Sequence, residues 1–159
     1  MSVGLRALTI GAALGCGTVG GVFFGFSAFV MDGLSRLPPA QGIAAMQSIN
    51  VTAVRPAFMI TLFGTAAACI PLTVAAMRTW GDPPATLLLS GSVLYLIGTI
   101  GLTIAYHVPL NNALAAVDPT AADAPVHWSS YLESWTRANH VRAGAALAAA
   151  GTFTLALNA

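Results

Sequence analysis

The sequence predicts an all-α fold class: a bundle of four transmembrane helices with short amphipathic helices in the first and third loops. Of the 159 residues, 57% are hydrophobic and only 7% are charged, whereas about a quarter of the residues of a soluble domain carry charge. Charge is absent from residues 7–31, 56–77, 83–117 and 143–159. Because a span needs roughly 20 mostly apolar residues, we expect a single transmembrane domain, residues 1–159, with spans at about 5–31, 57–77, 85–107 and 138–158.

The charge and the cysteines of the sequence indicate which partners the protein binds and in which part of the cell it lies. The net charge is +1 and every basic residue is an arginine, so the clustered Lys and Arg of a nucleic-acid-binding protein are lacking. Cys16 and Cys69 both fall inside predicted spans, where a small apolar role is expected in preference to a disulfide or a metal site. The lipid bilayer is therefore the expected partner, and the chain is expected to be a multi-pass protein of the cell inner (plasma) membrane.

The first span is rich in glycine. Its apolar run of about 25 residues is longer than the core of a signal peptide, so we expect a retained helix. Gly11 and Gly15 form one small-xxx-small register, and Gly17, Gly21 and Gly25 form another, and such registers let a second helix approach closely. We expect packing inside the monomer, with a homo-oligomer through these glycines as the alternative.

The connections come next along the chain. Pro39 is expected to start a short helix in the first loop, and this helix would turn Asn50 toward the bundle. Arg55-Pro56 marks the start of the second span, residues 78–84 form a tight turn, and the third span is expected to end near His107, before Pro109. Asp118-Pro119 and Asp123-Ala124-Pro125 are both plausible helix starts. A last helix of about 33 residues, roughly 50 Å long, would project beyond a hydrocarbon core of about 30 Å.

Reactive side chains are concentrated in residues 128–142, WSSYLESWTRANHVR. In a helix, Trp128, either Tyr131 or Leu132, Trp135, Asn139 and Arg142 recur at three- and four-residue spacing and line one stripe. The first and third loops of a four-crossing bundle share one membrane side. Ten candidate site residues all fall in these loops or at the helix ends that adjoin them: Asn50, Arg55, His107, Asn111, Asn112, Trp128, Trp135, Asn139, His140 and Arg142.

This asymmetry indicates a functional site, because ionisable groups near membrane depth are costly and usually paired or functional. Plainer roles remain open. The arginines could be interface anchors, the tryptophans could belong to an interfacial aromatic belt, and Asn50 and Asn139 could join helices. No role is expected for His127. Four of the six arginines lie on the polar side, so the positive-inside rule favours a cytoplasmic site.

At these residues the chain resembles a family of small four-helix membrane proteins whose named members are anthrone oxygenases. The resemblance covers nearly all of the chain. It rests on FxFSxFVM at Phe24 to Met31, AMQSIN with the following Arg55-Pro56, the VPLN turn at Val108 to Asn111, and the pattern W-x6-W-x3-N-x2-R that ends at Arg142. His107 stands before the VPLN turn, where the family pattern has asparagine.

The resemblance implies an oxygenase that uses no cofactor and no metal, and that oxidises a hydrophobic, anthrone-like polycyclic phenol to a quinone with O2. His140 or His107 would be the catalytic base, and Asn50, Asn139 and Arg142 would hydrogen-bond the enolate that develops. Aromatic stacking would hold the rings. The expected substrate-binding residues are Asn50, Arg55, Asn111, Trp128, Trp135, Asn139, Arg142 and Phe26.

Two other classes of function remain open. A metal-dependent oxidoreductase could use His107 and His140 as imidazole ligands, although only Glu133, Asp118 and Asp123 could supply carboxylates nearby. A non-catalytic membrane carrier, or the partner subunit of a complex, would need the same helices. Bound metal would favour the first class, and a bundle with no cavity at the polar end would favour the second.

Overall fold

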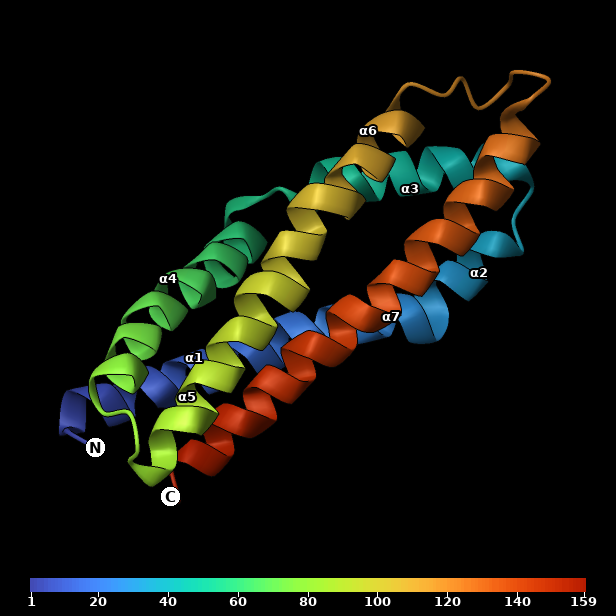
Figure 1. The fold of residues 1–159 in the computed structure, drawn as a ribbon. Coiled ribbons are helices and arrows are strands. Elements are labelled where there is room, and N and C mark those ends of the chain that lie inside the picture. The colour runs from blue at the N-terminus through green and yellow to red at the C-terminus, as the bar shows by residue number, and fades with distance from the viewer.

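The computed structural model describes residues 1–159, all of the chain, and it is all-helical, as predicted (Figure 1). The α-helices are α1 (Val3–Gly25), α2 (Met31–Ser35), α3 (Pro39–Ala53), α4 (Pro56–Arg78), α5 (Pro83–Val93), α6 (Val108–Ala115) and α7 (Ala124–Ala156). Three π-helical segments, in which N–H groups bond carbonyls five residues back, are η1 (Phe26–Val30), η2 (Leu94–Gly101) and η3 (Thr103–His107).

Three continuous helical rods are long and apolar enough to cross a membrane: Val3–Ser35, Pro56–Arg78 and Pro83–Ala115. These apolar rods are those of a membrane protein. The fourth predicted span, 138–158, falls in α7, which is helical to Ala156 but is not among the three. Its many alanines are only weakly hydrophobic, and it carries Asn139, His140 and Arg142 near its start, so the fourth crossing stays a prediction.

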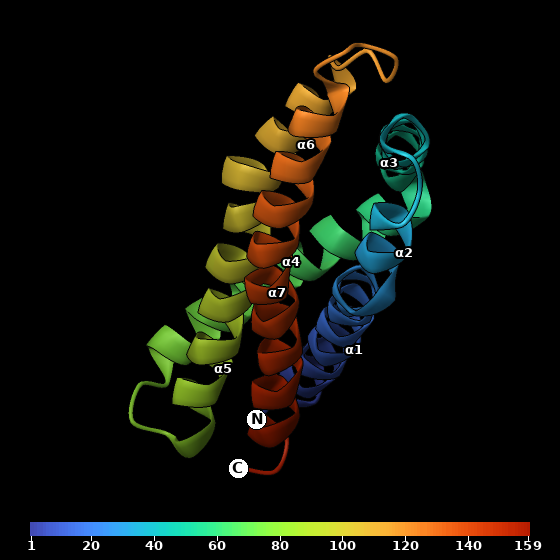
Figure 2. The same cartoon turned by 90° about the vertical axis from the view of Figure 1, so that its right-hand side faces the viewer.

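The first and third loops, which were predicted to share one membrane side, lie at the same end of the molecule. Figure 1 shows α3, α6 and the connection between α6 and α7 at one end, and both termini with the α4–α5 turn at the other. The α7 helix packs along α1, and along α5 and the segments that follow it up to α6 (Figure 2). The stripe on α7 therefore meets residues from both of its long neighbours.

The prediction that the third long helix ends near His107 was wrong. The helix continues through η3 into α6 and ends at Ala115, so the short helix expected in the third loop is a direct extension of the span. In η3 the Val108 N–H bonds the Thr103 carbonyl. The wider π turn makes room for Pro109, which lacks an N–H and would otherwise break an α-helix. The first rod likewise runs past residue 31 to Ser35 through η1.

Two other helix predictions are confirmed. Pro39 begins α3 in the first loop, and the last helix has 33 residues, starting directly after Asp123. Asp118-Pro119, by contrast, starts no helix, because the Asp118 carboxylate accepts hydrogen bonds from the N–H and hydroxyl of Thr120, both at 2.8 Å, and so closes a turn.

The buried side chains form two clusters. The larger lies between α1, α4, α5 and α7, and it contains Cys16 and Cys69, which are free and fully buried, as expected of small core residues. Gly15 faces Thr65 of α4 and Gly20 faces Leu147 of α7, so α1 uses glycines for packing inside the monomer. A Cβ at Gly11 or Gly21 would have no neighbouring atoms within 4 Å, and the homo-oligomer stays a prediction.

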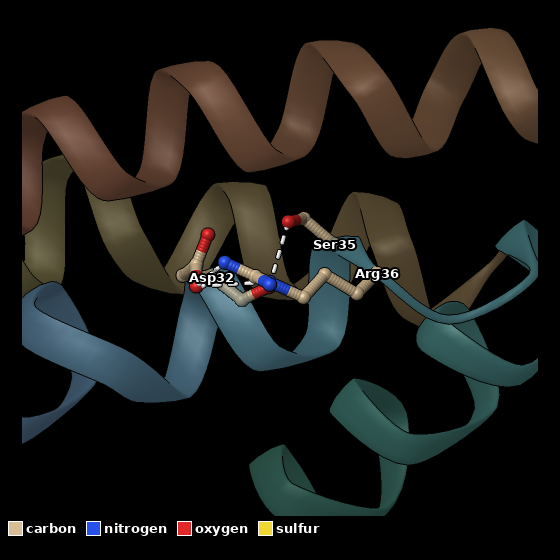
Figure 3. Close-up of polar contacts among 3 residues, drawn as sticks. All are labelled: Asp32, Ser35 and Arg36. Carbon is tan, nitrogen blue, oxygen red and sulfur yellow. Dashed lines mark hydrogen bonds and ion pairs between the residues drawn. The ribbon is translucent and has the colours of Figure 1, made fainter.

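An exposed ion pair ends the first rod (Figure 3). Arg36 Nη2 lies 2.9 Å from Asp32 Oδ2, and the Ser35 hydroxyl donates to the Asp32 carbonyl at 2.7 Å. Both charged side chains are solvated, so the pair contributes no more than about 0.5 kcal/mol. Arg36 is therefore an arginine that pairs with a carboxylate at the protein surface.

The smaller cluster joins α3 to the first half of α7, and Gly42 makes this contact close. A Cβ at Gly42 would lie 2.8 Å from two ring carbons of Trp128. Gly42→Ala is therefore expected to lower the free energy of unfolding by about 1–3 kcal/mol, since overpacking forces the ring to move. Thermal unfolding in detergent measures this loss. Gly33→Ala is the control, because a Cβ at Gly33 would have no neighbouring atoms within 4 Å. Equal melting temperatures for the two variants would contradict the prediction.

Candidate functional site

The stripe on α7 is buried along its whole length. Trp128, Tyr131, Trp135, Asn139 and Arg142 are at most 5% exposed. Three- and four-residue steps keep them on one face of the helix. That face meets η1, η3 and α3. The site is therefore formed by α7 together with these three elements, at the end of the molecule that holds α3 and α6.

Asn139 connects α7 to the first rod. It is fully buried, and its Nδ2 donates to the Phe23 carbonyl and to the Ser27 hydroxyl, both at 2.8 Å. Its Oδ1 accepts from Arg142 Nε at 3.1 Å and from Arg142 Nη2 at 2.7 Å. Because both of its N–H groups are used inside the protein, Asn139 positions Arg142 and has no donor left for a ligand.

Arg142 is a buried cation with no carboxylate partner. The guanidinium is stacked over the Phe23 ring, with Cζ 3.7 Å from the ring centroid, and Nη1 donates to the Thr103 hydroxyl at 3.3 Å. All five acidic side chains are exposed, and the two ion pairs of the structure involve other residues. A desolvated cation–π contact contributes about 2 kcal/mol, whereas burying an ion costs several kcal/mol, so an anion bound here would be strongly stabilised.

His107 and this cation both lie against the Trp135 ring, and His107 has a free ring nitrogen. The side chain is 1% exposed, and its ring meets the Trp135 ring edge-on at 5.3 Å. Nδ1 lies 3.2 Å from the Leu102 carbonyl. A carbonyl oxygen only accepts, so Nδ1 carries the proton, and Nε2 of the neutral ring carries a lone pair. This Nε2 atom is buried and has no hydrogen-bond partner, which is the arrangement that a proton acceptor requires.

Aromatic rings line the rest of the site and are called its aromatic wall below. The Tyr131 hydroxyl and Trp135 Nε1 both donate to Asn111 Oδ1, at 2.8 and 3.0 Å. The Phe26 ring lies 5.6 Å from that of Trp135. Burial raises the pKa of Tyr131, so its hydroxyl is a neutral donor. Asn111, which was expected to bind substrate, is therefore engaged in holding two rings of this wall.

Asn50 and Trp128 have donors without acceptors. Asn50 Nδ2 and Trp128 Nε1 are buried and make no hydrogen bond. Asn50 is half-buried on α3 and comes from the face that was predicted to point toward the bundle. Buried polar groups are normally paired, so together with His107 these residues leave three buried polar atoms at this end of the molecule without a partner.

Two of the predicted site residues lie elsewhere. His140 and Arg55 are both exposed. His140 lines a surface hollow of about 450 Å³ between the first rod and α7, together with Asp32, Glu133 and Arg137. Since consecutive residues on a helix do not share a face, His140 points away from the stripe that contains its neighbour Asn139.

No group of three or more His, Cys, Asp or Glu side chains is placed to hold a metal ion. His107 and His140, the predicted imidazole ligands, are buried in the site and exposed on the surface, respectively. A second hollow, of about 460 Å³, lies at the opposite end of the bundle between the termini and the α4–α5 turn. Neither hollow is lined by a residue of the buried stripe.

Three contributors to the site had no distinct signal in the sequence. Thr103 and Ser27 are the hydroxyls that bond Arg142 and Asn139, and both are ordinary residues of apolar helices. The Leu102 carbonyl orients His107. Ser27 belongs to a π-helical segment, and η3 begins at Thr103 and ends at His107. Such segments are rare and are frequent at functional sites.

Comparison with known proteins gives one family. The sequence model of the family described as anthrone oxygenase matches residues 51–152, which is more than half of the chain. The matched region contains His107, Asn111 and all of the buried stripe on α7. No curated protein and no solved structure matches the chain.

Proposed function

Because the chain belongs to the anthrone oxygenase family, we propose that it oxidises anthrone-like polycyclic phenols to quinones without a cofactor. The observation that carries the proposal is the buried Arg142 cation, which has no carboxylate and is enclosed by aromatic rings beside the free Nε2 of His107. The substrate would bind at the membrane edge of a four-crossing bundle, with residues 138–158 as the fourth span, in the inner (plasma) membrane. A hydrophobic substrate dissolved in lipid would enter such a site from the membrane.

The chemistry follows from these groups. His107 Nε2 would remove one proton from the methylene carbon of the central ring, and the electron pair would be delocalised through the flanking aromatic rings into the carbonyl on the opposite side of that ring, to give an enolate. Arg142 and Asn50 Nδ2 would donate to the enolate oxygen, since fixed donors stabilise charge as it develops. Trp128, Trp135 and Phe26 would hold the rings, and Asn139 would act through Arg142.

The oxygen steps then need no other oxidant. The enolate passes one electron to O2, and the resulting carbon radical and superoxide combine at the same carbon to form a peroxide. The peroxide takes the proton from His107, and loss of one water leaves the second carbonyl of the quinone. Anthrone and O2 thus give quinone and water.

A second candidate is a non-catalytic membrane carrier or the partner subunit of a complex, and it is suggested by the burial of the stripe. Neither hollow opens onto the buried stripe. A carrier would bind the same aromatic anion but would release it unchanged. The two candidates differ in whether O2 is consumed.

Oxygen uptake by the detergent-purified protein, supplied with emodin anthrone, tests the proposal. After subtraction of spontaneous oxidation, one O2 is expected per anthrone, and dialysis against a chelator is expected to leave the rate unchanged. A rate that falls on chelation and returns with added metal would support a metal oxidoreductase. Folded protein that binds the anthrone without taking up O2 would support the carrier.

A further inference from the structure

The surface hollow between the first rod and α7 contains charged groups of both signs. Its volume is about 450 Å³, and it is lined by Asp32 of the first rod and by Glu133 and Arg137 of α7. Asp32 is already paired with Arg36 (Figure 3). Glu133 and Arg137 are four residues apart, a spacing at which a carboxylate and a guanidinium commonly pair on a helix, but the two ion pairs of the structure involve other residues. One free carboxylate and one free guanidinium therefore remain for a ligand.

The hollow lies at the depth of the lipid head groups. The first rod, Val3–Ser35, has 33 residues and is about 50 Å long, whereas the hydrocarbon core of a bilayer is about 30 Å thick. A rod centred in the bilayer extends about 10 Å beyond the core at each end. Asp32 and Ser35, which line the hollow, belong to the last turn of this rod. They are therefore placed in the head-group layer.

The two free charges are arranged in the order of a phospholipid head group. The α7 helix starts at the end of the molecule that holds α3 and α6 and runs back alongside the first rod (Figure 1). Arg137 is one turn, about 6 Å, further along this helix than Glu133 and so lies deeper. In phosphatidylethanolamine the phosphate is attached to the glycerol, near the hydrocarbon chains, and the primary ammonium lies two carbons further out. An inner guanidinium and an outer carboxylate match this order.

A serine hydroxyl supplies a second donor for the phosphate. Ser27 lines the hollow from the first rod, and its Oγ accepts from Asn139 Nδ2 at 2.8 Å. It does not donate to the carbonyl four residues back, as the hydroxyls of Thr61 and Thr154 do, so its O–H is free. Phosphate oxygens accept several hydrogen bonds, and those from charged donors are the strongest. The hollow therefore offers a phosphate one charged donor and one neutral donor.

Other small ligands match these groups less well. An inorganic anion would share the hollow with Glu133 and a simple cation would share it with Arg137, and like charges in one site repel each other. A quaternary ammonium, as in phosphatidylcholine, is typically bound by aromatic rings, and no Phe, Tyr or Trp lines the hollow. A primary ammonium instead donates N–H groups to a carboxylate.

The surface next to the hollow, on the side of the hydrocarbon core, suits acyl chains. Phe24 comes one turn before Ser27 on the first rod and is 56% exposed, and Leu147 comes two turns after His140 on α7 and is 41% exposed. A lipid whose head group occupies the hollow would lay its chains against these apolar side chains. Free phosphoethanolamine has the same head-group chemistry but lacks this contact.

We propose that the hollow binds the head group of phosphatidylethanolamine, with the phosphate at Arg137 and Ser27 and the primary ammonium at Glu133. The bound lipid would join the first rod to α7, because it contacts both. The hollow is separate from the buried stripe, so this inference goes beyond the proposed function and does not rest on it.

Lipid binding by the full chain in detergent tests the inference. Native mass spectrometry of the protein titrated with dioleoyl phosphatidylethanolamine gives the affinity. Dioleoyl phosphatidylcholine lacks the ammonium N–H groups at unchanged charge, and dioleoyl phosphatidylglycerol lacks the ammonium. Phosphatidylethanolamine is expected to bind about tenfold more tightly than either, since a hydrogen bond to a charged group contributes roughly that factor. Phosphoethanolamine is expected not to displace the bound lipid, even in large excess.

Two variants separate the two ends of the head group. Glu133→Gln is expected to remove most of the preference over phosphatidylcholine and to leave phosphatidylcholine binding unchanged. Arg137→Gln is expected to weaken all three lipids, because all three contain the phosphate. Both residues are exposed, so the variants should fold. The matched controls are Asp123→Asn and Arg55→Gln, which change exposed charges outside the hollow and should bind lipid like wild type.

Three outcomes would overturn the inference. The first is equal affinity of wild type for the three lipids, and the second is a preference for phosphatidylethanolamine that survives Glu133→Gln. The third is displacement of the lipid by an equal concentration of phosphoethanolamine, which would identify the free compound as the ligand. Oxygen uptake enters none of these measurements, so the failure of this inference and the failure of the proposed function are distinguishable.

Discussion

Replacing His107 by alanine is expected to lower the rate of anthrone-dependent oxygen uptake by about 10²- to 10⁴-fold, the usual contribution of a general base. The reason is geometric. The Leu102 carbonyl fixes the proton on Nδ1, so the buried Nε2 has a lone pair and no partner. The loss should appear in kcat, because the alanine leaves Arg142 and the aromatic wall in place. Initial rates over a range of anthrone concentrations measure it.

Two further histidines serve to test this assignment. His127→Ala is the control, because His127 is exposed and pairs only with Asp123 on its own helix. It should keep the wild-type rate. His140→Ala distinguishes the two predicted bases, and we expect less than a twofold change, since His140 is exposed on the outer face of α7. A loss at His140 as large as that expected at His107 would refute the assignment and place the base in the surface hollow.

The stripe on α7 could be predicted because helical periodicity is a local property. Residues three and four apart share a face whatever packs against them, so the spacing of Trp135, Asn139 and Arg142 was sufficient. The same rule excludes His140 from that face once Asn139 faces inward. Taking His140 as a base relied on proximity in sequence, which does not mean proximity in space on a helix.

The partners of the stripe could not be predicted in the same way. Thr103 and Ser27 meet α7 only because two rods from distant parts of the sequence pack on either side of it. The π turns that let the helix continue past Pro109 depend on that packing as well, since a proline read locally ends a helix. The sequence therefore predicted the stripe on α7, whereas the atoms that face this stripe are determined by tertiary packing.

Asn139→Ala is expected to lower the free energy of unfolding by about 3 kcal/mol, because removing one member of a buried polar network leaves the others unsatisfied. The change deletes both hydrogen bonds to the first rod and both bonds accepted from Arg142. Only Thr103 would then accept from the guanidinium. Denaturant unfolding in detergent, followed by tryptophan fluorescence, measures the loss.

The size of this effect distinguishes a positioning residue from simple helix–helix attachment. Interhelical hydrogen bonds in membrane proteins average only about 0.6 kcal/mol, so a cost near 1 kcal/mol would mean that Asn139 merely joins α7 to α1. Asn112→Ala is the control, since Asn112 is exposed and its loss should change stability by less than about 0.5 kcal/mol. Asn139→Asp should recover part of the stability, because a carboxylate still accepts from Arg142. If alanine and aspartate are equally destabilising, the bonds to Phe23 and Ser27 provide the stability, and the guanidinium is held by its aromatic neighbours.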